Sequence, residues 1–325
     1  MITRRKIVIA LGAGALAPLA CFAQQQNVYR VGVLTSEGVA SSRLRMDAFS
    51  SALRELGYVE GGNLVLTYRY ADGDLARLPA LAEELVRTKP DVIFAPNTVS
   101  VVAAKKAAPA TPIVFSNAGD PVADGLVASL RRPGGNITGT TNITTDLAAK
   151  RLEILKETVP SATRVAVLLD DSRVNLRQVE MLPSAAKALG VQLLMTDLLR
   201  REDFERRSAE LKQWRANAIY IVSGPNNTFN RALHVEFAVK LRLPTVGAIR
   251  EFPEAGGLMS YGPNFEALYR RAAAYIDKIL KGAKPGDIPV EQPTTFDFVV
   301  NMKTAKALGI KIPNSIMVRA TKVIE

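Results

Sequence analysis

The chain has 325 residues, of which 48% are hydrophobic and 22% charged, and its formal net charge is +11. This length allows roughly two domains of about 150 residues, each able to bury a core without a metal or disulfide staple. The single cysteine, Cys21, and the single histidine, His234, exclude an intramolecular disulfide and the common zinc sites. Basic residues are interleaved with acidic ones and form no block with aromatic residues, so we expect no nucleic-acid partner.

Residues 1–23 have the pattern of a secretory signal peptide. A basic segment precedes an apolar run, and small residues stand before Gln24, which predicts cleavage after Ala23 and a periplasmic location. Lipid attachment at Cys21 is the alternative. The apolar run also contains a G-x-G-x-x-A pattern typical of NAD-binding enzymes, but Pro18 interrupts the helix that this motif requires. An NAD-dependent oxidoreductase is therefore the less favoured alternative function.

Strand and helix patterns alternate along the rest of the chain. A first set predicts strands at 29–35, 63–71, 91–96 and 112–117, and helices at 42–57, 75–88 and 100–108. A second set predicts strands at 164–169, 191–196, 218–223 and 244–249, and helices at 176–190, 203–215 and 229–241. Because strand–helix–strand units impose right-handed crossovers, each set predicts a doubly wound parallel sheet.

The second set repeats the first. RVGVLTSE (30–37) is echoed by RVAVLLDD (164–171), and SSALRELG (50–57) by PSAAKALG (183–190). The offset is nearly constant, and a repeat this long is a whole domain rather than a solenoid unit. Two similar α/β lobes imply a cleft between them.

The C-terminal third departs from the repeat. It predicts strands at 256–262 and 296–301 and helices at 266–282 and 303–309. We expect the chain to cross between lobes near 140–142, 256–257 and 289–293, so that three connecting strands form a hinge. The predicted lobes comprise 28–141 plus 257–286, and 142–256 plus 287–325.

Polar side chains follow the predicted strands where ligands of open parallel sheets bind. The candidates for binding a small polar ligand are Ser36, Glu37, Asn97, Thr98, Ser116, Asn117 and Asp120 in the first lobe, and Asp171, Ser172, Arg173, Ser223 and Asn226 in the second. Tyr261 is the aromatic residue that we expect to stack on the ligand. Several of these residues also precede predicted helices, so helix capping alone is the alternative role.

No catalytic arrangement is evident in the sequence. It contains neither a G-x-S-x-G nor a G-x-x-x-x-G-K-[ST] motif, and His234 lies inside a predicted helix without a nearby nucleophile. Asp170 and Asp171 are adjacent on a strand end and point to opposite faces. We therefore expect a protein that is not an enzyme and that has no catalytic residues, no cofactor and no metal site.

Four long segments, 53–86, 119–139, 250–264 and 289–316, resemble the ABC-transporter substrate-binding proteins of the TrpX-like family. The resemblance extends over nearly the whole mature chain. It implies a periplasmic-binding-protein type I fold, an amino-acid-like solute, and permease and ATPase subunits as partners. Characterised relatives bind aromatic amino acids, as the resemblance suggests, and we expect a monomer.

The resemblance assigns individual residues only in part. Asp120 matches the family's Asp-Pro after the fourth strand, Thr98 the threonine of its Gly-Thr-Pro turn, and Tyr261 the tyrosine of its Ser-Tyr-Gly-Pro-Asn string. Segment 35–38 lacks the His-Pro of the aromatic-binding branch, and segment 170–173 lacks the usual Asn-Pro. Both segments face the predicted cleft, so the identity of the solute stays open.

The predicted function is capture of a small polar, amino-acid-like solute by closure of the two lobes, for delivery to an ABC importer. The predicted partner is an amino acid or a small carboxylate. The carboxylate and amino groups of the solute would meet helix N-termini, Asp120 and the hydroxyl groups, and its apolar part would meet Tyr261. A periplasmic ligand-sensing domain would use the same cleft, and the sequence leaves this alternative open.

Overall fold

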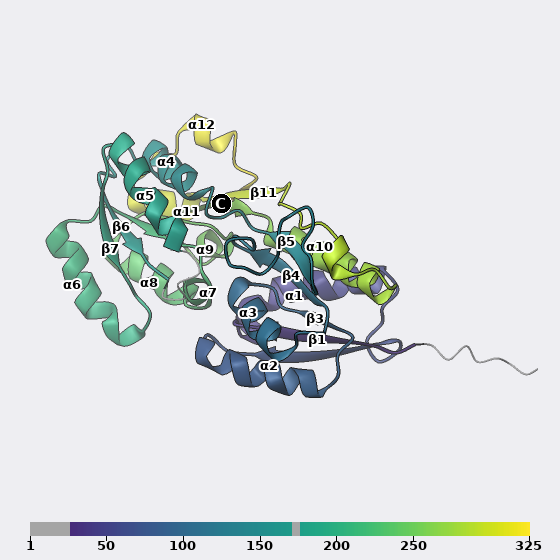
Figure 1. The fold of residues 1–325 in the computed structure, drawn as a ribbon. Helices are drawn as coiled ribbons and strands as arrows, with labels where there is room; N and C mark the ends of the chain where they lie inside the picture. The colour runs from purple at the N-terminus through teal and green to yellow at the C-terminus, as the bar shows by residue number, and fades with distance from the viewer. Residues whose placement is uncertain (1–26, 171–175) are drawn as a thin grey trace, which may run out of the picture.

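The computed structural model describes residues 27–170 and 176–325, so the predicted signal peptide lies outside the described residues. Two α/β lobes, each built on one sheet, lie side by side (Figure 1). Within the described ranges, no helix combines the length and apolar character needed to cross a membrane.

The sheet of the first lobe has the strand order β2-β1-β3-β4-β5, and all neighbouring strands are parallel. In β1 the last five residues are buried, which fits the continuous apolar runs of parallel strands covered on both faces. The strands are β1 (Tyr29–Thr35), β2 (Leu64–Tyr70), β3 (Val92–Phe94), β4 (Ile113–Ala118) and β5 (Ile137–Thr141).

Helices cover both faces of this sheet. Leu81 of α2 and Val101 of α3 belong to the core on one face. On the other face, Phe49 of α1 and Tyr269 of α10 pack on Phe94 of β3, with ring centroids 4.3 Å and 5.4 Å apart. The helices are α1 (Val39–Glu55), η1 (Leu75–Arg77), α2 (Leu78–Arg87), α3 (Thr98–Ala107) and α10 (Phe265–Leu280).

The sheet of the second lobe has the order β12-β11-β10-β9-β8-β6-β7 and is parallel except between β10 and β11. Its strands are β6 (Arg164–Leu168), β7 (Gln192–Thr196), β8 (Ala218–Ile221), β9 (Thr245–Gly247), β10 (Met259–Pro263), β11 (Phe296–Asn301) and β12 (Lys322–Ile324). The remaining helices are α4 (Ala148–Thr158), α5 (Leu176–Ala188), η2 (Arg201–Asp203), α6 (Phe204–Trp214), α7 (Pro225–Phe229), α8 (Arg231–Leu241), α9 (Glu251–Glu254), η3 (Pro285–Asp287), α11 (Met302–Leu308) and α12 (Asn314–Met317).

A buried arginine ties the start of the second lobe to its sheet. Arg151 of α4 is fully buried, and its Nε donates to the Tyr220 hydroxyl of β8 at 2.9 Å. Its Nη2 donates to the Thr144 carbonyl at 2.7 Å and to Gln178 Oε1 of α5 at 2.9 Å. Because these bonds satisfy the buried charge from three directions, they fix the segment that enters the lobe after β5.

Two boundaries between the lobes differ from those predicted. β10 belongs to the second sheet rather than to the first lobe, because it pairs in parallel with β9 and antiparallel with β11. Residues 287–291 stay with the first lobe, where the Val290 N–H donates to the Leu130 carbonyl at 2.7 Å and Thr140 forms a bridge with Glu291. The chain therefore crosses after β5, after β10 and before β11, and α10 packs beside α1 (Figure 1).

Candidate functional site

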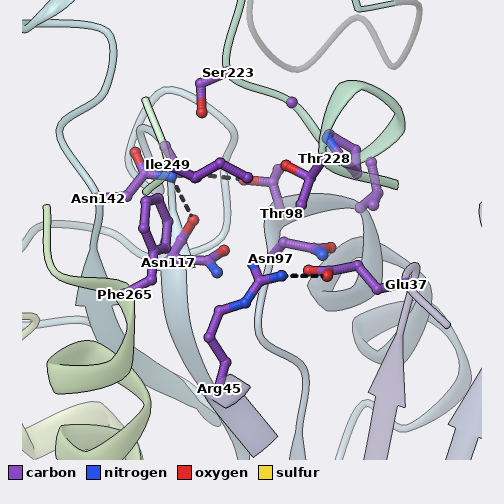
Figure 2. A pocket seen from close by; sticks show the side chains of 14 residues that line it. Glu37, Arg45, Asn97, Thr98, Asn117, Asn142, Ser223, Thr228, Ile249 and Phe265 are labelled. Carbon is purple, nitrogen blue, oxygen red and sulfur yellow. Dashed lines mark hydrogen bonds and ion pairs between the residues drawn. The ribbon is translucent and has the colours of Figure 1, made fainter. Parts of the chain in front are cut away.

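A pocket lies between the two lobes, beyond the carboxyl ends of strands from both sheets (Figure 2). Its cavity has a volume of about 50 Å³, and about 490 Å³ of space lies between atoms when open solvent is included. Its lining, within the described residues, is Glu37, Arg45, Asn97, Thr98, Val99, Asn117, Gly119, Asn142, Ser223, Gly224, Pro225, Thr228, Ile249 and Phe265.

One wall of the pocket is the start of α3. Asn97 is the N-cap of this helix, and its Oδ1 accepts from the Ser100 N–H at 3.2 Å. Its Nδ2 donates to the Ser36 hydroxyl at 2.8 Å, which holds the loop after β1 against the loop after β3. The N–H groups of the first helical turn, those of Thr98 and Val99, belong to residues that line the pocket. Such groups favour an anionic partner.

The floor of the pocket carries a buried ion pair. Arg45 Nη2 donates to Glu37 Oε2 at 2.6 Å, and the two side chains are only 4% and 3% exposed (Figure 2). Burial raises the pKa of Glu37, although the Arg45 guanidinium partly offsets this effect. Burial acts to lower the pKa of Arg45, but the carboxylates of Glu37 and Glu251 outweigh it and leave that pKa raised. Arg45 Nε lies 3.6 Å from Glu251 Oε1 of the second lobe.

The other walls combine amides, a hydroxyl and two apolar side chains. Asn142 Nδ2 donates to the Asn117 carbonyl at 2.7 Å, so the crossing segment after β5 is bonded to the end of β4. Ser223 stands just before α7 in the second lobe. Ile249 and Phe265 supply apolar surface (Figure 2). The pocket can thus contact charged, polar and apolar parts of one small molecule.

Five of the predicted site residues meet at this pocket: Glu37, Asn97, Thr98, Asn117 and Ser223. Four of them, Glu37, Asn97, Thr98 and Ser223, follow a strand, and Asn117 lies at the carboxyl end of β4 (Ile113–Ala118). The rule about the carboxyl ends of parallel strands therefore located the pocket from both lobes.

Other predicted residues lie outside this lining. Ser36 and Ser116 are buried beneath it, with 1% and 0% of their surface exposed. Asp120 faces a neighbouring hollow, where its Oδ1 accepts from the Ala123 N–H and its Oδ2 lies 2.6 Å from Arg177 Nη1. Asn226 borders a different hollow on the far side of α7.

Tyr261 also does not line the pocket. Its ring stacks on Phe296 with centroids 6.3 Å apart and meets Phe298 edge-on at 5.7 Å. This placement follows from the position of β10 in the second sheet, where Tyr261 pairs with Phe298 of β11. The predicted residues Asp171, Ser172 and Arg173 lie outside the described residues.

The sequence prediction missed several lining residues, above all Arg45 and Phe265. Arg45 lies inside α1, where the loop rule does not select residues, whereas Phe265 is the first residue of α10 and stands two residues after β10. A signal for Arg45 did exist, because it shares one face of α1 with the buried Phe49 and Ala52. A charged residue on an apolar helix face is rarely buried without a partner.

The described residues that line the pocket include no histidine and no cysteine. No group of three or more His, Cys, Asp or Glu side chains that could hold a metal ion occurs in ranges 27–170 and 176–325. His234 is fully buried in α8, and its Nε2 lies 2.9 Å from the Leu198 carbonyl, away from the pocket lining.

Comparisons with known proteins agree with this geometry. The chain is 28% identical over 264 residues, 81% of its length and 76% of the relative's, to the "Tyrosine-binding protein" of Clostridioides difficile (strain R20291). It superposes with a TM-score of 0.83 on an ABC domain from Streptococcus pneumonia in complex with L-Trp, at 25% identity, covering 92% of this chain and 100% of that one. A ligand-free, open structure of a substrate-binding protein with adhesive properties from Clostridium difficile is 26% identical, covers 92% and 99% of the two chains, and superposes with a TM-score of 0.65.

The architecture and the family model lead to one assignment. Two parallel-sheet lobes joined by three crossings form the periplasmic-binding-protein type I fold, which the solved structures share. The family model for ABC transporter substrate binding proteins matches residues 31–324. The chain therefore belongs to the family of ABC transporter substrate-binding proteins.

Proposed function

We propose that this protein is exported, captures an amino acid in the pocket between its lobes and delivers it to an ABC importer. The observation that carries the proposal is the pocket itself, to which both lobes contribute charged, polar and apolar side chains. The names of two similar proteins support the choice of solute, since one is a tyrosine-binding protein and the other was solved with L-Trp.

The chemistry of the pocket fits an amino acid. The first-turn N–H groups of α3 and the amides of Asn97 and Asn117 are donors for a carboxylate. Ile249 and Phe265 offer an apolar surface for a side chain. Such a division into a few polar anchors and an apolar wall is typical of small-molecule sites.

Capture would work by closure of the lobes. A ligand that contacts both lobes binds the closed arrangement better than the open one, and this difference in affinity drives the change. The structure superposes better on the L-Trp complex, with a TM-score of 0.83, than on the ligand-free, open structure, with 0.65. This difference supports a pocket that is assembled when the lobes are together. The predicted signal peptide at 1–23 supports export.

A thermal-shift screen tests the proposed function. Residues 24–325 would be heated with L-tyrosine, L-tryptophan or L-leucine, with glucose as a control. At 100 times its dissociation constant, a ligand should raise the free energy of unfolding by about 2.7 kcal/mol, which appears as a higher melting temperature. Small-angle scattering should show the same ligand reducing the radius of gyration. A shift with glucose and with none of the amino acids would contradict the proposal.

A further inference from the structure

The pocket contains one acidic side chain among its described lining residues, that of Glu37. This side chain is 3% exposed, so its charge is removed from bulk water. A buried carboxylate is costly unless cations or hydrogen-bond donors surround it. The partners of Glu37 therefore show how much of its charge is already compensated.

Glu37 shares its cation with a second carboxylate. Arg45 lies 2.6 Å from Glu37 Oε2 and 3.6 Å from Glu251 Oε1, so one guanidinium serves two acidic groups. Arg231 adds a weaker attraction to Glu37 from farther away, and it forms no ion pair with Glu37 in the described part of the chain. In direct contacts, the carboxylates of Glu37 and Glu251 therefore share a single cation, Arg45.

The two oxygens of Glu37 are used unequally. Oε2 accepts from Arg45 Nη2, whereas no described residue donates a hydrogen bond to Oε1. Arg45 Nη2 also donates to the Ser41 carbonyl at 2.8 Å, which fixes the position of the guanidinium. Arg45 therefore fixes the carboxylate at the pocket floor and leaves one acceptor oxygen for another donor.

We propose that Glu37 accepts the ammonium group of the solute, and that Arg45 is the positioning residue that holds Glu37 for this contact. This inference rests on the proposed function, since it gives a direction to an amino acid in the pocket. The ammonium group lies at the Glu37 floor, and the carboxylate lies toward the start of α3. The Asp120 carboxylate, which the sequence suggested for the same role, is engaged by Arg177 in a neighbouring hollow.

The test compares amino acids with analogues that lack the amino group. Calorimetry would give the affinities of L-tyrosine and 3-(4-hydroxyphenyl)propionate, of L-tryptophan and indole-3-propionate, and of L-leucine and 4-methylpentanoate. In the wild type the amino acid should bind more tightly than its analogue. Glu37→Gln should reduce this preference by about 10- to 100-fold, because a hydrogen bond to a charged group contributes about 1.5–3 kcal/mol.

Two further variants keep the result interpretable. Asp120→Asn removes a carboxylate of the same lobe that does not line the pocket, and it should leave the preference unchanged. Glu37→Asp keeps the charge with a shorter reach, so it should retain part of the preference, and it replaces Glu37→Gln if that variant does not fold. Circular dichroism and melting temperature check the fold of each variant.

The outcomes separate this inference from the proposed function. An amino acid that binds wild type and both Glu37 variants with the same preference over its analogue would overturn the role of Glu37, while leaving the proposed function in place. Wild-type protein that binds no amino acid would overturn the proposed function and, with it, this inference. A preference that falls in Glu37→Gln and persists in Asp120→Asn supports both.

Discussion

The one histidine of the chain, His234, is fully buried in α8, and its Nε2 bonds to the Leu198 carbonyl at 2.9 Å. Burial lowers the pKa of His234 to about 4, although the bond to Leu198 acts slightly in the opposite direction. In the unfolded chain the pKa returns to about 6.5. Between these values the unfolded chain binds a proton that the native protein excludes, so stability falls as pH drops through this range.

Acidification should therefore destabilise the protein through this residue. From pH 7 to pH 5 the free energy of unfolding should fall by about 2 kcal/mol on account of His234. Urea unfolding followed by circular dichroism at the two pH values measures this change. His234→Gln keeps an N–H that can reach the Leu198 carbonyl, and glutamine does not titrate. The free energy of unfolding of this variant should therefore fall by about 2 kcal/mol less than that of the wild type between pH 7 and pH 5. Equal losses in both proteins would contradict the argument.

The candidate site could be predicted where a residue directly follows a strand. Glu37, Asn97 and Ser223 were found because the carboxyl ends of parallel strands converge at one edge. Arg45 could not be found by that rule, since it reaches the pocket from inside α1. The prediction that Tyr261 stacks on the ligand does not match its place in the structure, where it pairs with Phe298 of β11. Sequence patterns do not identify strand partners, so this placement could not be predicted.

At the scale of elements, β4 and β5 approach so closely that only glycine fits at position 139. A Cβ on Gly139 would lie 1.9 Å from the Phe115 carbonyl oxygen, a backbone atom that cannot turn aside. The register of the two strands shifts between Phe115 and Ala118. Asn117 lies within this shift, and its carbonyl accepts a hydrogen bond from Asn142 Nδ2 at the pocket. This close approach therefore sets one corner of the candidate site.

Gly139→Ala should push β5 away from β4 and disturb that corner. We expect a loss of about 1–3 kcal/mol in the free energy of unfolding, the usual cost of overpacking, together with weaker ligand binding. Thermal unfolding and calorimetry measure the two effects. Gly282→Ala is the matched control, because Gly282 also has a positive φ, of +99°, but has nothing within 4 Å of the added Cβ. The Gly282→Ala variant should lose stability without losing affinity for the ligand. Unchanged ligand binding in Gly139→Ala would refute the link between Gly139 and the pocket.

The long elements of both lobes were predictable because parallel strands and amphipathic helices leave strong periodic patterns. The predicted helix at 266–282 corresponds to α10, and the strand at 296–301 is β11. The pairing of β10 was not predictable in the same way. β10 follows β9 through the short α9 and joins the same sheet, whereas the next element, α10, packs on the other lobe. Local patterns define elements, but partners far along the chain decide the lobe to which each element belongs.

At the scale of the whole molecule, a few contacts hold the lobes together. Arg45 of α1 faces Glu251 of α9 at 3.6 Å, in a largely buried setting. Arg177 of α5 meets Asp120 at 2.6 Å, but these side chains are 62% and 41% exposed. Buried and exposed ion pairs differ in energy, since water screens the exposed ones. The Arg45–Glu251 contact should therefore contribute more to closure.

Glu251→Gln should weaken the closed state, because it removes the second-lobe partner of Arg45. We expect the affinity for amino acids and for their analogues to fall by about tenfold or more, because the substitution breaks a buried ion pair between the lobes. Asp120→Asn should cost less than about fivefold, because an exposed pair contributes at most about 1 kcal/mol. Calorimetry gives these ratios, and scattering of the ligand-free variants reports how open they are. Equal effects of the two substitutions would argue against a special role of the buried pair.

The three crossings between lobes also bear on the order in which the chain can fold. The core of the first lobe needs Tyr269 and Ile276 of α10, and the second sheet needs β11 and β12 near the end of the chain. Neither half can complete its core until the ribosome has made most of the C-terminal third. A nascent chain of this kind has no finished domain until late in its synthesis, which under the export proposed above would keep it unfolded for passage through a secretion channel.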